Sequence, residues 1–148
     1  MSSIVVLAVG KIKERGLREA VDDYAKRTSR HFPVEEIEVR DAPAPVLAPA
    51  LERKLPSPAH VVALDVGGRA MSSEAFARWL EARASRGKGK VVFLIGGADG
   101  LPQPILARAD EKLSLSAMTL PHRIARLVLL EQIYRAVTIL RGEPYARV

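Results

Sequence analysis

Four short apolar runs, rich in β-branched residues, constrain the fold of this chain more than any other feature. They are Ile4–Val9, Val34–Val39, Val61–Leu64 and Val91–Ile95. Three of them are continuously apolar, as in strands covered on both faces, whereas VEEIEV alternates and fits the edge of a sheet. Because helical patterns separate the runs, the sequence predicts an α/β fold with a mostly parallel sheet and helices on both faces.

Two helices are expected between these strands. Residues Leu17–Phe32 repeat apolar side chains every three or four positions, and Pro33 ends the pattern. A second helix begins at Ser72 or Ser73, either of which can cap its first turn, and ends near Gly87. Connections of this kind are short right-handed crossovers between parallel strands.

The last third of the chain predicts a strand, a loop and a long helix. Leu113–His122 reads as a short strand leading into a loop, and Ile124–Leu140 is apolar on nearly every side of a helix. Pro121 suits the first turn, while Gly142 and Pro144 end the helix. A helix this apolar is either central to the core or half core and half subunit interface. We favour the second interpretation and expect a homodimer.

Composition narrows the class of protein. With 148 residues, the chain is expected to form a single domain, residues 1–148. The absence of cysteine excludes disulfides, thiolate metal sites and a cysteine nucleophile, and we expect no metal. A net charge of +6 and a pI of about 10.0 suit a polyanionic partner bound by a folded surface. Neither a signal peptide nor a membrane span is indicated, so a cytoplasmic protein is expected.

A double glycine follows the fourth apolar run, in VVFLIGGADGLP, residues Val91–Pro102. The stretch lacks the G-x-G-x-x-G of a dinucleotide fold, and no Gly-Lys-Ser/Thr follows as in a phosphate-binding loop. The glycines alone indicate a sharp turn or a close approach to the backbone. Taken by itself, this pattern is more typical of a turn than of a binding site.

Three segments together resemble a known family. They are VALDVGG (Val62–Gly68), FLIGGADGL (Phe93–Leu101) and LSLSAMTLPHRIARLVLLEQIYRA (Leu113–Ala136), and the opening LAVGKIKE and closing PYARV match as well. In this order and spacing they resemble the small SPOUT-class methyltransferases that methylate N3 of a pseudouridine in large-subunit ribosomal RNA. The resemblance implies this reaction for the chain, with the assembled ribosome as substrate.

The same resemblance implies a fold and a cofactor. The C-terminal third would thread through a loop into a deep trefoil knot, approximately residues 62–140, and S-adenosyl-L-methionine would lie bent in that knot beside the dimer interface. The double glycine would let the backbone approach the cofactor. Carried over residue by residue, the implied cofactor-binding positions are Leu64, Gly96, Gly97, Leu115, Ser116, Ala117, Met118, Thr119 and Leu120. Adenine would pack among the leucines and Met118, with loop amides and carbonyls at its polar edge.

Candidate catalytic residues follow the cofactor loop. The ring N3–H must lose its proton, and His122 could accept it, hydrogen-bond the substrate, or simply structure the turn before the helix. Arg126 and Arg135 are expected to face an interface or RNA, with a phosphate contact predicted for Arg126. As the alternative, Glu131 lies within helical reach of both arginines. His31 and His60 are expected to be structural.

The C-terminal tail is a further candidate. In the family a PYHR-like end closes over the site, where Tyr145 would stack on a base and Arg147 would contact phosphate. This chain has Ala146 where the family usually has histidine, which places any catalytic role of that residue in doubt here.

The stretch Asp41–His60 holds five of the ten prolines and predicts mostly loop, with a short helix around Leu51–Leu55. Family members carry a more basic helical stretch over Asp41–Pro58, so fewer RNA contacts are expected from it here.

Three alternative functions make different demands on the sequence. A SPOUT enzyme acting on another RNA, such as tRNA, would share the fold and cofactor. A cofactor-free ribosome-binding protein would keep only the fold. An α/β hydrolase would need a serine in a G-x-S-x-G elbow, which this sequence lacks.

Overall fold

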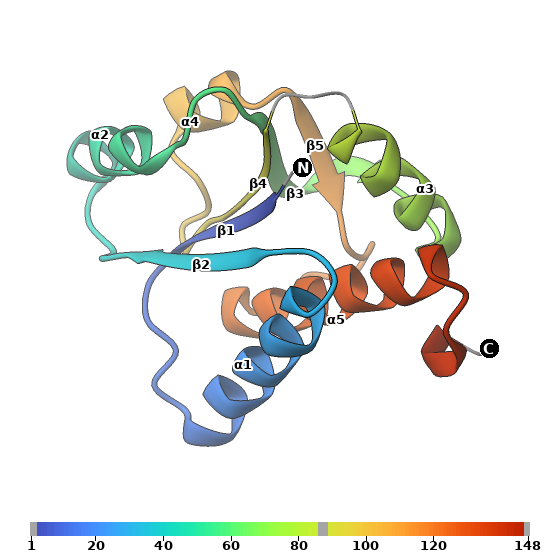
Figure 1. The fold of residues 1–148 in the computed structure, drawn as a ribbon. Helices are drawn as coiled ribbons and strands as arrows, with labels where there is room; N and C mark the ends of the chain where they lie inside the picture. Colours follow the sequence, from blue (N-terminus) through green and yellow to red (C-terminus); the bar gives the residue numbers. More distant parts are fainter. Residues whose placement is uncertain (1–2, 86–88, 147–148) are drawn as a thin grey trace.

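The computed structural model describes residues 3–85 and 89–146. Within them the chain alternates strands and helices along most of its length (Figure 1). The elements are β1 Ser3–Val9, α1 Arg15–Ser29, β2 Val34–Val39, α2 Ala44–Lys54, β3 His60–Ala70, α3 Ser73–Ala84, β4 Lys90–Ile95, α4 Gln103–Arg108, β5 Glu111–Ser114, α5 His122–Leu140 and the 3-10 turn η1 Pro144–Ala146.

The five described strands form one sheet in the order β2-β1-β4-β3-β5, and every strand pair is parallel. The predicted α/β class with a parallel sheet is therefore confirmed. The alternating strand β2 lies at an edge, as its pattern predicted, and Ser72 caps α3 by accepting from the amide of Ala75 at 3.1 Å. The trefoil knot stays a prediction.

Helices cover both faces of the sheet (Figure 1). One core joins α1, α3 and α5 to the side chains that β1 and β4 direct to one face, with Phe93 and Leu129 fully buried. The other core lies beneath α2 and α4, around Leu7, Leu51 and Leu94. The continuous apolar runs in β1 and β4 follow from this arrangement, because alternate residues enter different cores.

The helix α2 corrects the expectation of a mostly irregular segment. It spans Ala44–Lys54 because Pro45 sits in the first turn, where no intrahelical amide bond is needed, and because Leu47 and Leu51 are buried one turn apart. Burial of these leucines outweighs the amide bond lost at Pro49 inside the helix. The short helix α4 was not anticipated, since its six residues bury only Ile105 and leave no periodic signal.

Strand β3 continues six residues beyond the predicted Val61–Leu64, to Ala70. Its register with β5 shifts between Leu64 and Arg69, so an irregularity lies in VALDVGG. A Cβ on Gly68 would come within 2.7 Å of the backbone of Leu113, and only glycine allows this approach of β3 to β5. The irregularity leaves Leu64 and the residue after it at the edge of a cavity.

No helix among the described residues combines the length and apolar character that a bilayer-spanning segment requires. The long helix α5 buries Leu129, Leu130 and Ile133 in the core, while Ile124 and Leu140 are exposed. This burial confirms that one side of α5 belongs to the core. The predicted subunit interface on its other side stays a prediction.

Candidate functional site

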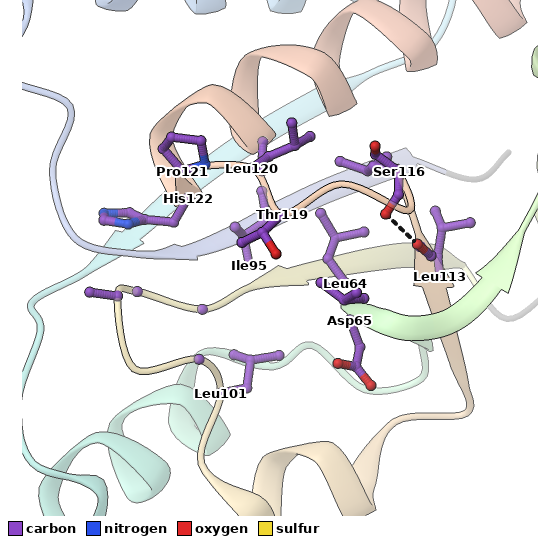
Figure 2. A pocket seen from close by; sticks show the side chains of 18 of the residues that line it. Leu64, Asp65, Ile95, Leu101, Leu113, Ser116, Thr119, Leu120, Pro121 and His122 are labelled. Atoms are coloured by element: carbon purple, nitrogen blue, oxygen red, sulfur yellow. Dashed lines mark hydrogen bonds between the residues drawn. The ribbon is translucent and has the colours of Figure 1, made fainter.

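A cavity of about 660 Å³ opens at the carboxyl ends of β4 and β5 and beside the irregular part of β3 (Figure 2). Ligands of open α/β sheets bind at this edge, and the volume is that of a small-molecule site. The segments 64–66, 95–101 and 113–122 supply most of the wall. The predicted cofactor residues that line it are Leu64, Gly96, Gly97, Leu115, Ser116, Met118, Thr119 and Leu120, whereas Ala117 does not.

The double glycine makes the turn after β4, and both positions are closely packed. A Cβ on Gly96 would lie 2.5 Å from the carbonyl carbon of Gly100. A Cβ on Gly97 would lie 3.2 Å from Val9 and 3.3 Å from the carboxylate of Asp41. Gly96 is therefore required by the way the loop folds back on itself, whereas a side chain at Gly97 would press on two neighbouring side chains. The approach of the two glycines to a ligand is a separate role that stays a prediction.

The loop after β5 is held by its own serines. The hydroxyl of Ser114 donates to the carbonyl of Ser116 at 3.0 Å, the dashed line in Figure 2. The hydroxyl of Ser116 accepts from the amide of Met118 at 2.9 Å. The Ser116 side chain thus shapes the loop. Because Met118 is 76% exposed, it can reach a bound adenine only at the rim of the cavity.

The cavity wall is mainly apolar, and of the described residues that line it only two side chains can carry charge, Asp65 and His122. Figure 2 shows them well apart, with His122 on the left and Asp65 right of centre. Within residues 3–85 and 89–146, no lysine or arginine lines the cavity. This composition is unfavourable for a phosphate group and suits a neutral or cationic ligand.

His122 is the first residue of α5, and its half-buried ring faces the loop after β1. Gly10 in that loop has φ of +90°, and a Cβ there would lie 4.0 Å from Nε2 of the histidine. Pro121, before it, lies at the N-cap position. His122 therefore combines a structural place at the helix start with access to the cavity.

The position of Arg126 corrects the predicted phosphate contact. Its side chain is 1% exposed and pairs with Glu36 and Glu38 on β2, not with Glu131. Glu131 instead pairs with Arg135 at 2.7 Å, as its helical spacing indicated. A guanidinium buried in this way cannot contact RNA without breaking two ion pairs.

The tail lies at the other end of α5. The hydroxyl of Tyr145 donates to Glu131 at 2.8 Å and lies 3.2 Å from the hydroxyl of Tyr24, and burial raises its pKa. Its ring meets that of Tyr134 edge-on, with the centroids 4.7 Å apart. At 1.5 Å per residue, its partners Glu131 and Tyr134 place the ring about 14–18 Å along the helix from His122. Arg147 lies outside the described residues.

Several wall residues were not anticipated from the sequence. Asp65 is the most informative, since it follows Leu64 directly in VALDVGG and carries the carboxylate of the cavity. Ile95 and Leu101 flank the double glycine, and Pro121 precedes the histidine. All of them lie inside the three motifs, so their place in the motifs could have identified them as wall residues.

Comparison with known proteins assigns the class. A family model described as "Predicted SPOUT methyltransferase" matches residues 2–146, so the chain belongs to the SPOUT methyltransferase family. Over 143 residues it is 54% identical to the "Ribosomal RNA large subunit methyltransferase H" of Sorangium cellulosum, covering 97% of this chain and 98% of that protein. The protein of the same name from Acetivibrio thermocellus is 45% identical over 157 residues, with coverages of 97% and 99%.

Solved structures agree on the fold. A probable methylase family protein from Haemophilus influenzae matches 99% of this chain and 71% of its own, with a TM-score of 0.57 and 13% identity. The SpoU methyltransferase AviRb from Streptomyces viridochromogenes matches 95% of this chain and 61% of its own, with a TM-score of 0.52 and 16% identity. At these identities the likeness shows the fold alone.

Proposed function

We propose that this protein transfers a methyl group from S-adenosyl-L-methionine to N3 of a pseudouridine in large-subunit ribosomal RNA within the assembled ribosome. The observation that carries the proposal is the cavity, which gathers the residues of three motifs at one edge of the sheet. The full-length relatives named as ribosomal RNA large subunit methyltransferases support the substrate class. Such a substrate implies a cytoplasmic enzyme.

The residues of the cavity fit this cofactor. Apolar side chains such as Leu64 and Leu120 offer surfaces for adenine, and the glycine loop offers exposed backbone groups to its polar edge. A carboxylate, with no lysine or arginine among the described residues of the wall, suits the positive charge of a sulfonium. When bound, the cofactor supplies an electrophilic methyl group, so the protein has mainly to align two reacting centres.

His122 is the group we assign to the proton. As N3 gains its bond to carbon, the N3–H bond breaks, and a neutral imidazole offers one acceptor nitrogen for that proton. The residue lines the cavity at the start of α5, so its ring is within reach of a base bound there. Ala146 offers no comparable acceptor in the tail.

A homodimer would bring the tail to a cavity. Tyr145 contacts the distal half of α5, about 14–18 Å from the histidine of its own chain, so its ring does not cover its own cavity. Two copies packed through the partly exposed side of α5 on which Ile124 lies would set each tail near the cavity of the other copy. There the tyrosine ring could stack on the target base.

The test is methyl transfer from labelled cofactor to ribosomes from a strain that lacks the native methyltransferase. Free ribosomal RNA and tRNA serve as comparison substrates, and mass spectrometry locates the label. Label on N3 of one large-subunit pseudouridine, in assembled ribosomes alone, is the expected result. Label on tRNA would leave the fold assignment intact and show that the substrate is tRNA. Calorimetry that detects no cofactor binding would favour a ribosome-binding protein without activity.

A further inference from the structure

A second hollow, of about 350 Å³, lies between the C-terminal end of α1 and the distal part of α5 (Figure 1 shows the two helices side by side). Its wall is mostly polar and charged, unlike the first cavity. Lys26 and Arg30 come from α1 and its C-cap, and Tyr134 from α5. We call it the α1–α5 hollow. None of its lining residues belongs to the cavity assigned to the cofactor.

The charges in the α1–α5 hollow do not balance. Arg27 pairs with Asp23 at 2.9 Å. Glu143 lies 3.5 Å from the ring of His31 within the hollow and pairs with Arg141 at 3.1 Å outside it. Lys26 and Arg30, by contrast, are exposed and have no ion-pair partner among the described residues. Two uncompensated cations therefore face one concave surface, which favours an anion with more than one charged group.

Compensation of the helix dipole explains part of this arrangement. Basic side chains in the last turn of a helix stabilise its exposed carbonyls, and α1 ends in this way. The helix α2 ends likewise, with the exposed Arg53 and Lys54, but on the opposite face of the sheet and outside the hollow. The two helix ends thus carry the same charge at different places on the surface. Comparing them distinguishes a contribution to the helix dipole from anion binding in the hollow.

The α1–α5 hollow adjoins the tail. The ring of Tyr134 lines the hollow and packs against Tyr145 at 4.7 Å between centroids, and the guanidinium of Arg27 lies 5.7 Å from the centroid of Tyr134. The proposed base-stacking side chain and the two free cations are therefore neighbours on one end of the protomer. A polynucleotide presents a base and its flanking phosphates in just this proximity.

We propose that the α1–α5 hollow binds backbone phosphates of the ribosomal RNA strand next to the target nucleoside, through Lys26 and Arg30. The inference rests on the proposed function, because it places part of that substrate. It adds a phosphate site made by the folded surface, separate from both the cofactor cavity and the tail.

The test is a double charge reversal, K26E/R30E, compared with R53E/K54E at the end of α2. Affinity for the substrate ribosomes is measured over a range of salt concentrations, with cofactor affinity by calorimetry and oligomeric state by sedimentation as controls. We expect K26E/R30E to weaken ribosome binding at least tenfold near physiological salt. The slope of log affinity against log salt should fall by about 1.5, as for two lost phosphate contacts. R53E/K54E should match the wild type.

Other outcomes overturn the inference. Unchanged affinity and salt slope in K26E/R30E, with an active wild type, would remove the hollow from the RNA surface while leaving the proposed function intact. An equal loss in R53E/K54E would show a general effect of net charge. The charge-conserving K26R/R30K should bind ribosomes like the wild type, and a loss there as large as in the reversal would mean that the contact is not ionic. A wild type that neither binds nor methylates ribosomes would instead contradict the proposed function.

Discussion

The guanidinium of Arg126, in the second turn of α5, lies 2.9 Å from the carboxylate of Glu36 on β2. The same group pairs with Glu38 and donates to the carbonyl of Gly10 at 3.0 Å. One buried side chain thus joins the edge strand, the loop after β1 and the helix that begins with His122. The start of α5, and with it one wall of the cavity, depends on this set of contacts.

Replacing Arg126 with methionine should destabilise the protein strongly. The change removes the buried partner of two carboxylates, which keep the more exposed Arg18 as an ion-pair partner. A loss of about 3 kcal/mol, the low end for a broken buried pair, is therefore expected. Urea denaturation measures the difference. The control is Arg15→Met, whose partner Glu19 is exposed and whose loss should be undetectable. Similar midpoints for Arg126→Met and the wild type would contradict this account of the pair.

Glu111 makes stability depend on pH. Arg83 donates to its carboxylate at 2.7 Å, with Trp79 and His60 as further partners, and these contacts lower its pKa from 4.5 to about 2. Because the folded state binds this proton less readily than the unfolded state, the stabilisation is complete above pH 4.5 and is lost as the pH falls towards 2.

Glu111→Gln should remove that dependence. The variant should be about 2 kcal/mol less stable at pH 7, a value below the full shift because the side chain is partly solvated. Its free energy of unfolding should then change less than that of the wild type between pH 4.5 and pH 2. Parallel curves for the two proteins over this range would show that other carboxylates control acid unfolding.

The strands and the loops that line the cavity could be predicted because their signals are local. A continuous apolar run needs no partner to be recognised as a covered strand, and the three motifs each contain their own wall residues. The edge position of β2 followed from the alternation in VEEIEV, which also places Glu36 and Glu38 on one face. The sequence did not reveal the partner of these two carboxylates, because Arg126 lies about 90 positions away along the chain.

The helix α2 escaped prediction for a different reason. Proline costs a helix most in its interior and little in its first turn, so the effect of five prolines depends on where the helix begins. That start is set by the burial of Leu47 and Leu51 against the sheet, which is a tertiary contact. The place of Tyr145 is likewise tertiary, since its partners Glu131 and Tyr24 come from two helices.

Gly96→Ala should abolish cofactor binding. Its Cβ would lie 2.5 Å from the backbone of Gly100, so the loop that lines the cavity must move. We expect affinity for S-adenosyl-L-methionine to fall more than tenfold by calorimetry, with circular dichroism as the check on folding. Gly16→Ala is the matched control, because a Cβ at that position in α1 meets nothing within 4 Å. A Gly96→Ala variant that binds normally would show that the loop can adapt.

Asp65→Asn should reduce the preference for the cofactor over its product. The sulfonium carries a positive charge that S-adenosylhomocysteine lacks, and Asp65 is the carboxylate in the cavity wall. Removing one charge from a partly solvated site changes the relative affinity by roughly threefold to tenfold. Calorimetry with both ligands gives the ratio, and a loss of equal size for both would mean that the carboxylate does not sense the sulfonium.

Removal of residues 145–148 should leave cofactor affinity unchanged and stop methylation, because Tyr145 contacts the distal half of α5 and not the cavity wall.

Mixed dimers test whether the tail acts at the cavity of its own chain or at that of the partner. If it serves the partner, a dimer of one truncated chain and one His122→Ala chain has a single complete site, made of the intact histidine and the other chain's tail. Each homodimer alone should be inactive. When the two chains are co-expressed, the mixed dimers should restore up to half of the wild-type rate. Continued inactivity of the mixed dimer would mean that the tail acts within its own chain, and full activity of the truncated protein would leave the tail without a catalytic part.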